Sequence, residues 1–164
     1  MPDALKQHSF EPLEFVSKST DKLEEAMLEM GVEKIEPLSI FSDGVYVRKV
    51  FMPAGTPLVL GHEHKTRHLN VVVSGKALIS MNEGEPIMVH AGDVFESKAG
   101  VRKALYILED MEWMTIHPNP EELRTEEDIE DKFINKSDRY KEYASSKLLN
   151  SVQEIEETTV WHLE

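Results

Sequence analysis

A mainly β fold with helical arms at both ends is the fold class that the sequence predicts, and three observations lead to it. The chain has 164 residues, the size of about one domain. Between residues 45 and 116, runs rich in β-branched and aromatic residues alternate with turn residues, without a helical pattern between them. Both ends instead show helical periodicity and an excess of acidic side chains. Many short strands in one domain indicate a sandwich, jelly roll or barrel.

The N-terminal arm, residues 1–36, carries one helix pattern. Asp21 can cap a helix, with Glu24 three residues later, and Gly31 suits its end. Apolar residues recur between them at i, i+3, i+4 and i+7, namely Leu23, Ala26, Met27 and Met30. We therefore predict a helix over 21–30 that packs its Leu/Met face on the rest of the fold.

The central segment, residues 37–119, contains about eight runs of strand-forming residues. Turn residues separate these runs, among them Ser74-Gly75, residues 82–84 and Glu109-Asp110. We expect short strands at 45–52, 58–60, 69–73, 77–81, 87–90, 94–95, 104–108 and 113–116.

The C-terminal arm, residues 120–164, is predicted to be helical. Thr125 followed by Asp128 resembles a capping box. A second helical stretch is expected over 147–155, and residues 158–164 form either a strand or a frayed end. One helix face is expected to carry Ile129, Phe133, Lys136 and Tyr140.

The balance of charges narrows the possible partners. Lys plus Arg number 18 and Asp plus Glu 31, which gives a formal net charge of −13. Counted along the sequence, residues 1–36 contribute −5, residues 37–119 contribute −1 and residues 120–164 contribute −7. An acidic chain disfavours nucleic acid and anionic lipid, because both bind basic patches. No stretch reaches 18 apolar residues and the N-terminus has no secretory pattern, so we expect a cytoplasmic protein that does not enter a membrane.

Three histidines, His62, His64 and His68, fall within seven residues in a chain without cysteine. Positions i and i+2 of a strand share a face, so His62 and His64 are expected to project together, away from Glu63. His68 begins the next strand, and we expect it to join them. Three neutral imidazoles suit Zn, Fe, Cu or Ni and leave coordination positions open. The alternative is an exposed histidine-rich loop without a metal.

The spacing of these histidines resembles the first motif of the cupin family. Six residues separate Gly55 from His62-Glu63-His64; three residues then precede His68, and six more precede Gly75. The resemblance covers about residues 43–118. It implies a single double-stranded β-helix, which is a jelly-roll barrel, with a divalent metal ion held by the three histidines.

Departures from the cupin pattern concern the metal ligands. His68 stands where most cupins have Glu, Lys103 where the second motif has a His ligand, and Ile107 where it has Asn. A protonated lysine is repelled by a divalent cation. Three roles therefore stay open for Lys103: it pairs with an anionic substrate, loses its charge beside the metal, or extends out of the barrel mouth.

Longer stretches resemble a set of short cupins encoded by bacteriophages and prophages. An acidic helix containing Asp128-Ile129-Glu130 follows them, as is usual in that group. This resemblance implies a fold and a metal site, but no substrate. The matching stretches are residues 43–48, 52–56, 61–70, 97–104 and 109–117.

Further site candidates are polar residues in or at the ends of the central strands. This segment lacks an obvious pair of carboxylates for acid–base chemistry, so other groups would have to move protons. An arginine facing the cavity would hold an anionic substrate by a bidentate contact. The candidates are His117 as a fourth metal ligand or a rim residue, Lys103, Tyr46 and Tyr106 for catalysis, and Arg48 and Arg102 for substrate binding.

Two classes of function fit these residues. The first is an enzyme in which Fe, Zn, Mn or Ni acts on a small, polar, anionic molecule; dioxygenase, isomerase and lyase chemistry all occur in cupins. The second is a non-catalytic barrel that sequesters a small ligand or packs into an assembly, and a third reading is a structural barrel with incidental histidines. A homodimer is expected, because open sheet edges need to be covered.

Overall fold

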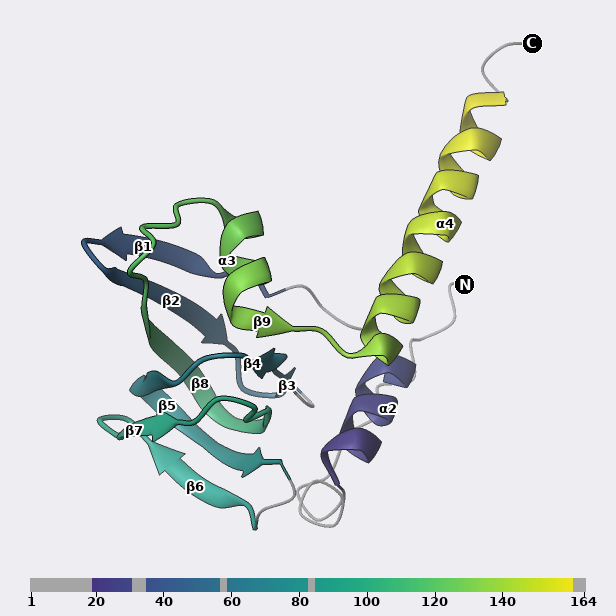
Figure 1. The fold of residues 1–164 in the computed structure, drawn as a ribbon. Helices are drawn as coiled ribbons and strands as arrows, with labels where there is room; N and C mark the ends of the chain where they lie inside the picture. Colours follow the sequence, from purple (N-terminus) through teal and green to yellow (C-terminus); the bar gives the residue numbers. More distant parts are fainter. Residues whose placement is uncertain (1–18, 31–34, 57–58, 83–84, 161–164) are drawn as a thin grey trace.

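The computed structural model describes residues 19–30, 35–56, 59–82 and 85–160, and these residues form an antiparallel, mainly β fold. A helix precedes the strands and two helices follow most of them, so the predicted fold class is confirmed (Figure 1). The elements are α2 (Thr20–Met30), β1 (Leu38–Ser42), β2 (Val45–Met52), β3 (Val59–Leu60), β4 (Glu63–His64), β5 (His68–Met81), β6 (Ile87–His90), β7 (Val94–Ser97), β8 (Lys103–Pro118), α3 (Glu126–Phe133), β9 (Ile134–Asn135) and α4 (Asp138–Val160).

Two long strands, β5 and β8, form the centre of the sheet. The strand order is β1-β2-β8-β5-β6, with β3 added to β8 and β7 added to β5, while β4 pairs with β9. Side chains alternate across these strands, so every second residue faces inward. The inward residues form the main apolar core, which includes Met52, Val72, Ala77, Ile79, Val89, Leu105, Ile107, Met111 and Trp113.

The predicted turns at Ser74-Gly75 and Glu109-Asp110 are wrong, because β5 and β8 continue without interruption through both positions. The structure has bulges there instead, with register shifts between Val72 and Ala77. A bulge inserts unpaired residues and bends the ribbon without ending it. Glycine and acidic residues therefore produced a turn signal at a bend inside two continuous strands.

The bend lets the two ends of this ribbon meet. Lys103 pairs with Met81 at the far end of β5 from His68, and a straight ribbon would separate the two ends by roughly 40 Å. In the structure, Lys103 Nζ lies 2.8 Å from His68 Nε2. The ribbon of β5 and β8 is therefore curved strongly enough to bring side chains at its two ends into contact. This curvature positions the residues of the candidate site described below.

Strand β1 was not predicted. Its inward residues are Ser39 and Phe41, whereas Leu38 and Ile40 are exposed. Apolar residues thus occur on both faces, and the segment shows no alternation that would mark a strand. It is recognised only by its pairing with β2, in which Ile40 lies opposite Val47.

The predicted N-terminal helix is confirmed by α2, which begins one residue earlier, at Thr20. Leu23 and Met27 are buried and pack with Ala104 of β8. Gly31, the expected end of the helix, lies outside the described residues, as do residue 58 and the turn residues 83–84.

The C-terminal arm differs from its prediction in two respects, of which the first is that residues 158–160 belong to α4 and not to a strand or a frayed end. The Thr125 cap is confirmed, since its hydroxyl accepts a hydrogen bond from the backbone N–H of Asp128. The single helix face from Ile129 to Tyr140 is wrong, because the chain becomes extended at Ile134 and forms β9. Pairing of β9 with β4 places Tyr140 on the next helix, α4, which also includes the expected stretch 147–155.

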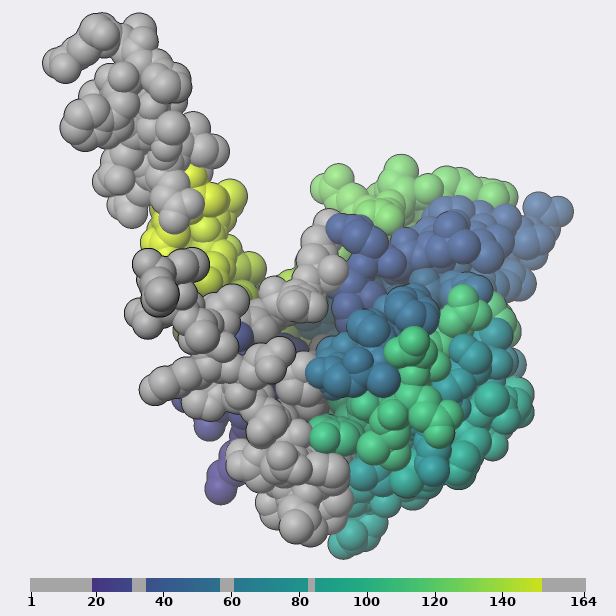
Figure 2. Space-filling model, turned by 180° about the vertical axis from the view of Figure 1, so that it is seen from behind, coloured from purple at the N-terminus to yellow at the C-terminus, as the bar shows by residue number. Residues whose placement is uncertain are grey.

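The helices lie on different sides of the strands. α3 lies beside β1 and β2, and α4 leads away from the strands (Figure 1). The view from behind shows α4, in yellow, standing clear of the rounded body that the strands form (Figure 2). Within the part of the chain that the structure describes, no helix is long and apolar enough to cross a membrane.

Candidate metal centre

Three histidine side chains from separate strands meet at one point. His64 lies in β4, His68 begins β5, and His117 lies near the end of β8. One ring nitrogen of each lies within 4.8 Å of those of the other two. The ring centroids are 4.2 Å apart for His64 and His68, 4.8 Å for His68 and His117, and 5.2 Å for His64 and His117. We call these residues the three-histidine cluster.

The cluster is shielded from solvent, and this sets its protonation. His68 is 2% exposed and His117 is 1% exposed. Desolvation is the main reason why the pKa of His64 falls to about 2, that of His68 to about 4 and that of His117 to about 3, and the charge of Lys103 contributes to each of these shifts. All three imidazoles are therefore neutral at neutral pH, and each has a ring lone pair to offer.

Hydrogen bonds to the cluster show which ring nitrogens remain available. His68 Nδ1 lies 3.2 Å from the carbonyl oxygen of Thr66, which can only accept, so Nδ1 donates and Nε2 carries the lone pair. His117 Nε2 lies 3.1 Å from the Thr115 hydroxyl. The Nδ1 atoms of His64 and His117 are buried without a partner in the described structure. Unpartnered nitrogens, together with carbonyl and hydroxyl groups that orient the rings, fit a divalent transition metal.

Lys103 is the fourth polar residue of this site. It is 7% exposed, so its side chain does not extend into solvent, and its Nζ lies 2.8 Å from His68 Nε2. Burial lowers the pKa of Lys103 to about 8. The ammonium group donates to the same lone pair that a metal would take. Lys103 therefore competes with a metal ion for His68.

His62 stands apart from the three-histidine cluster. The segment around it is irregular, so the alternation expected of a strand does not apply between His62 and His64. Its ring makes an edge contact with Tyr140 of α4, at 4.6 Å between centroids. Burial, together with the charges of Lys136, Arg102 and Arg48, lowers its pKa to about 4. The neighbouring Glu63 lies in β4, where its carboxylate accepts a hydrogen bond from the Asn135 amide.

The two tyrosines predicted as catalytic residues occupy different places. Tyr46 is buried and stacks on His117 at 5.6 Å, but its hydroxyl contacts Ser39 of β1. Tyr106 lies on the opposite side of β8 from Lys103, where it packs against the cluster formed by α2. Phe133 of α3 also packs against the three-histidine cluster, since its ring lies 5.2 Å from that of His117.

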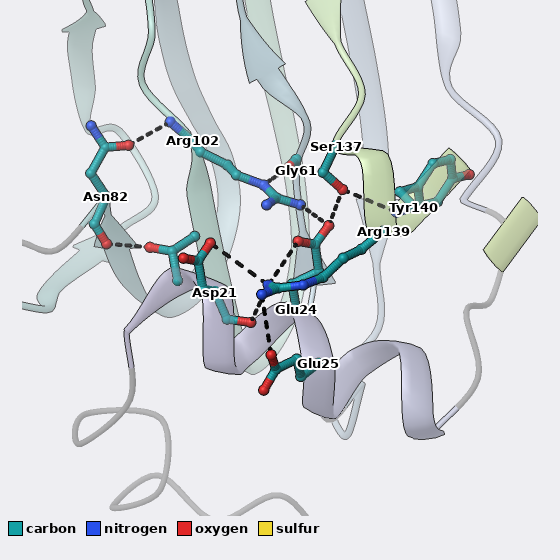
Figure 3. A network of polar contacts seen from close by, with 10 residues as sticks. Asp21, Glu24, Glu25, Gly61, Asn82, Arg102, Ser137, Arg139 and Tyr140 are labelled. Atoms are coloured by element: carbon teal, nitrogen blue, oxygen red, sulfur yellow. Dashed lines mark hydrogen bonds and ion pairs between the residues drawn. The ribbon is translucent and has the colours of Figure 1, made fainter. Parts of the chain in front are cut away.

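The two arginines predicted to bind substrate also differ. Arg48 faces inward on β2, and its buried Nε has no partner among the described residues. Arg102 is fully engaged: Nη2 lies 2.7 Å from Glu24 Oε1, and Nε donates to the Gly61 carbonyl at 3.0 Å (Figure 3). The positions of these side chains leave Arg48 available for a ligand and place Arg102 in a structural network.

This network joins both arms to the barrel. Glu24 of α2 is buried and accepts hydrogen bonds from Arg102 and from the Ser137 hydroxyl (Figure 3). Ser137 also accepts from the backbone N–H of Tyr140, which caps the start of α4. Arg139 of α4 lies 3.8 Å from Glu24 and 3.2 Å from Glu25. We call these contacts the Glu24 network.

Sequence reasoning missed several of these residues. Thr115 shares a strand face with His117 by alternation, which was a usable signal for its contact with the ring. Glu24 and Ser137 are 113 positions apart and carried no signal, since Glu24 had been assigned only to a capping box. The carbonyl of Thr66 is a backbone group, so no side-chain pattern could reveal it.

Comparison with known proteins gives a likeness in solved structures only. No family model and no curated protein matches the chain. One similar structure is an RmlC-like cupin family protein with a double-stranded β-helix fold from Methanocaldococcus jannaschii, at 13% identity and a TM-score of 0.46, covering 56% of this chain and 86% of that one. Another is a cupin-2 domain containing protein from Shewanella frigidimarina, at 15% identity and a TM-score of 0.44, covering 65% and 99%. A DMSP lyase from Ruegeria pomeroyi matches at 18% identity and a TM-score of 0.46, covering 56% and 50%.

Proposed function

We propose that this protein binds a divalent transition-metal ion at His64, His68 and His117 and, beside it, a small, polar, anionic molecule. The observation that carries the proposal is the meeting of three neutral, buried imidazoles, two of which have an unpartnered Nδ1. Neutral imidazole is a good ligand for Zn, Fe, Mn or Ni, and three protein ligands leave positions open for a small molecule.

The donor set also indicates what the site would supply. A bound metal ion would act as a Lewis acid towards an oxygen of the small molecule. Because imidazoles are uncharged, they leave the ion its full positive charge, which favours an anion. Thr66 and Thr115 hold two of the rings in place, and Phe133 excludes water from one side. The same arrangement serves a binding protein or an enzyme.

Metal content of protein purified without an affinity tag tests the proposal. We expect near-stoichiometric Fe, Mn, Ni or Zn in the wild type by elemental analysis. In His64→Ala and in His117→Ala we expect the metal to be lost, since removing one of three ligands weakens binding by about two orders of magnitude or more.

Two matched variants serve as controls for this experiment. His90 is exposed and lies outside the three-histidine cluster, so His90→Ala should keep its metal. His62→Ala should also keep it, because His62 contacts Tyr140 instead. Wild-type protein that holds no metal and takes up none on titration would refute the proposal. Loss of the metal in His62→Ala alone would mean that the metal binds at His62 and not at the three-histidine cluster.

Removing Lys103 should strengthen metal binding. Its ammonium group occupies the His68 lone pair and repels a cation, so we expect Lys103→Met to lower the metal dissociation constant by about tenfold or more. Competition with a chromophoric chelator measures this constant. Lys98→Met, the same change at an exposed lysine, should leave it unaltered. Weaker binding in Lys103→Met would show that Lys103 supports the metal site.

We also propose that two copies pair through the outer face of the sheet. Leu38, Ile40, Phe51, Leu69 and Val94 are 44–61% exposed on this face. Its charged residues compensate one another within each copy: Lys49 pairs with Glu112 at 2.8 Å, and Arg67 pairs with Glu96 at 3.5 Å. In a chain of net charge −13, an apolar and electrically neutral face is where a second copy meets the least repulsion.

The state of association is measured by light scattering after size exclusion. We expect a dimer for the wild type and a monomer for Phe51→Glu, because this places a charge within the apolar contact. Leu148→Glu, at an equally apolar and exposed position on α4, should remain a dimer. A monomeric wild type would contradict the proposal.

A further inference from the structure

A positively charged side chain, Arg48, lies on the inner face of the barrel without a counter-charge among the described residues. Its strand neighbours on the same face, Tyr46 and Met52, are both buried. Arg48 Nε is buried and makes no hydrogen bond with any described residue, and no ion pair to Arg48 occurs in that part of the chain. The guanidinium group therefore has unused donors inside the fold.

Arg48 lies next to the three-histidine cluster. In the sheet register it is opposite Thr115, whose hydroxyl contacts His117 Nε2. Its charge contributes to the lowered pKa values of His64 and His117, and also to that of His62. The field of Arg48 therefore reaches the site from the side of β2.

No residue in the described part of the chain neutralises this charge. Glu24 is the only carboxylate among the buried described residues, and it is already bonded to Arg102 and Ser137. Burying part of a guanidinium group without an anionic partner is costly. An incoming anion would supply the missing charge and the missing hydrogen-bond acceptor.

The number of free charges limits the kind of anion. Lys103 donates to His68, so Arg48 is the one permanent cation facing the cluster whose donors are unused in the described structure. A single positive charge balances a monoanion, and a planar guanidinium matches a planar carboxylate with two parallel hydrogen bonds.

We infer that Arg48 binds the carboxylate of a small organic acid whose second oxygen group lies towards His64, His68 and His117. The position of that second group rests on the proposed metal site, whereas the contact between Arg48 and the carboxylate does not. The ligand class is thus a short carboxylic acid with a neighbouring oxygen, such as a 2-hydroxy acid.

Nuclear magnetic resonance of the arginine Nε–H group tests the Arg48 contact directly. The Arg48 signal is identified by its absence in Arg48→Lys. Acetate, added to metal-free wild-type protein, should shift this signal, because it supplies the missing acceptor. An unmoved signal with acetate and with lactate would overturn the inference, and a larger shift with inorganic phosphate than with either acid would overturn the carboxylate class.

Calorimetry of zinc-loaded protein with lactate gives the second readout. We expect wild-type protein to bind lactate with a dissociation constant below about 1 mM, and Arg48→Gln to bind it about 10- to 100-fold more weakly. Arg48→Lys should fall between them, because it keeps the charge but not the two parallel bonds. Arg124→Gln, at an exposed arginine paired with Glu122, is the matched control and should bind like the wild type.

The two proposals fail in different ways. Zinc content should be the same in Arg48→Gln and in the wild type. A chain that takes up no metal but still shifts the Arg48 signal with acetate would refute the metal site and support the role of Arg48. A chain that binds zinc but binds lactate equally well in Arg48→Gln would refute the role of Arg48 and leave the metal site standing.

Discussion

Replacing Gly75 by alanine should remove most of the stability of this barrel. We expect the free energy of unfolding to fall by about 3–5 kcal/mol. Gly75 has a φ of +86°, a conformation that side chains disfavour. A Cβ there would lie 2.3 Å from the Asp110 carbonyl oxygen and 2.7 Å from Met111 Cα. Both are backbone atoms of β8, so neither can move without opening the contact between the two central strands.

Gly92→Ala separates the two contributions to this effect. Gly92 has a similar φ of +94°, but a Cβ there would meet nothing within 4 Å. We expect Gly92→Ala to cost only about 1–2 kcal/mol, which is the price of the backbone conformation alone. Urea unfolding followed by tryptophan fluorescence measures both variants, since Trp113 lies in the core. Equal losses in the two variants would show that the close approach to β8 is unimportant.

The bend at Gly75 also controls the site. His68 and Lys103 belong to opposite ends of the β5–β8 ribbon and meet only because it curves. Any Gly75→Ala protein that still folds should therefore bind metal more weakly than the wild type, although Gly75 touches none of the three histidines. Unchanged metal binding in a folded Gly75→Ala variant would show that metal binding does not depend on the curvature at Gly75.

Neutralising Glu24 should be the second most damaging single change. Its side chain is 2% exposed and that of Arg102 is 14% exposed, so Glu24→Gln leaves a largely buried guanidinium group without its counter-charge. We expect a loss of about 2–3 kcal/mol, less than the largest values for buried pairs because the amide still accepts a hydrogen bond and Arg139 reaches solvent. Thermal or urea unfolding measures the change.

Glu25→Gln is the matched control, one residue along the same helix. Glu25 is 55% exposed and pairs with Arg139 at 3.2 Å. Ion pairs in water contribute little, so the expected change is within about 0.5 kcal/mol. A comparable loss in both variants would mean that the charge of α2, rather than the buried contact, stabilises the fold.

The Glu24 network also predicts how stability depends on pH. Burial alone raises the pKa of Glu24, but hydrogen bonds from Arg102 and Ser137 and the charges of Arg102 and Arg139 bring it below the ordinary 4.5. A carboxyl group with a lowered folded-state pKa stabilises the fold above its unfolded pKa and loses that contribution as the pH falls through the folded value. The stability difference between wild type and Glu24→Gln should therefore shrink as the pH drops below about 4.5. A difference that stays constant would contradict this account.

Much of the fold followed from local patterns. β-branched runs predicted β2, and the Leu/Met stripe predicted α2, because alternation and helical periodicity are properties of neighbouring residues. The turn expected at Gly75 failed for the same reason: glycine marks an unusual backbone conformation, but only pairing with β8 decides between a turn and a bulge.

The sequence by itself determined the chemistry available to this protein. With no cysteine and three histidines within seven residues, it made imidazole the favoured ligand for the proposed metal site, and it placed most of the negative charge in the two arms. These are properties of composition and spacing, which survive in any fold.

Only the tertiary structure decided which of those residues act together. It joined His117 to His64 and His68, and it left His62 beside Tyr140. It engaged Arg102 with Glu24 and left Arg48 without a partner in the described part of the chain. The physical reason is that these choices depend on the curvature of a long paired ribbon and on contacts between segments up to 113 residues apart, neither of which a local pattern contains.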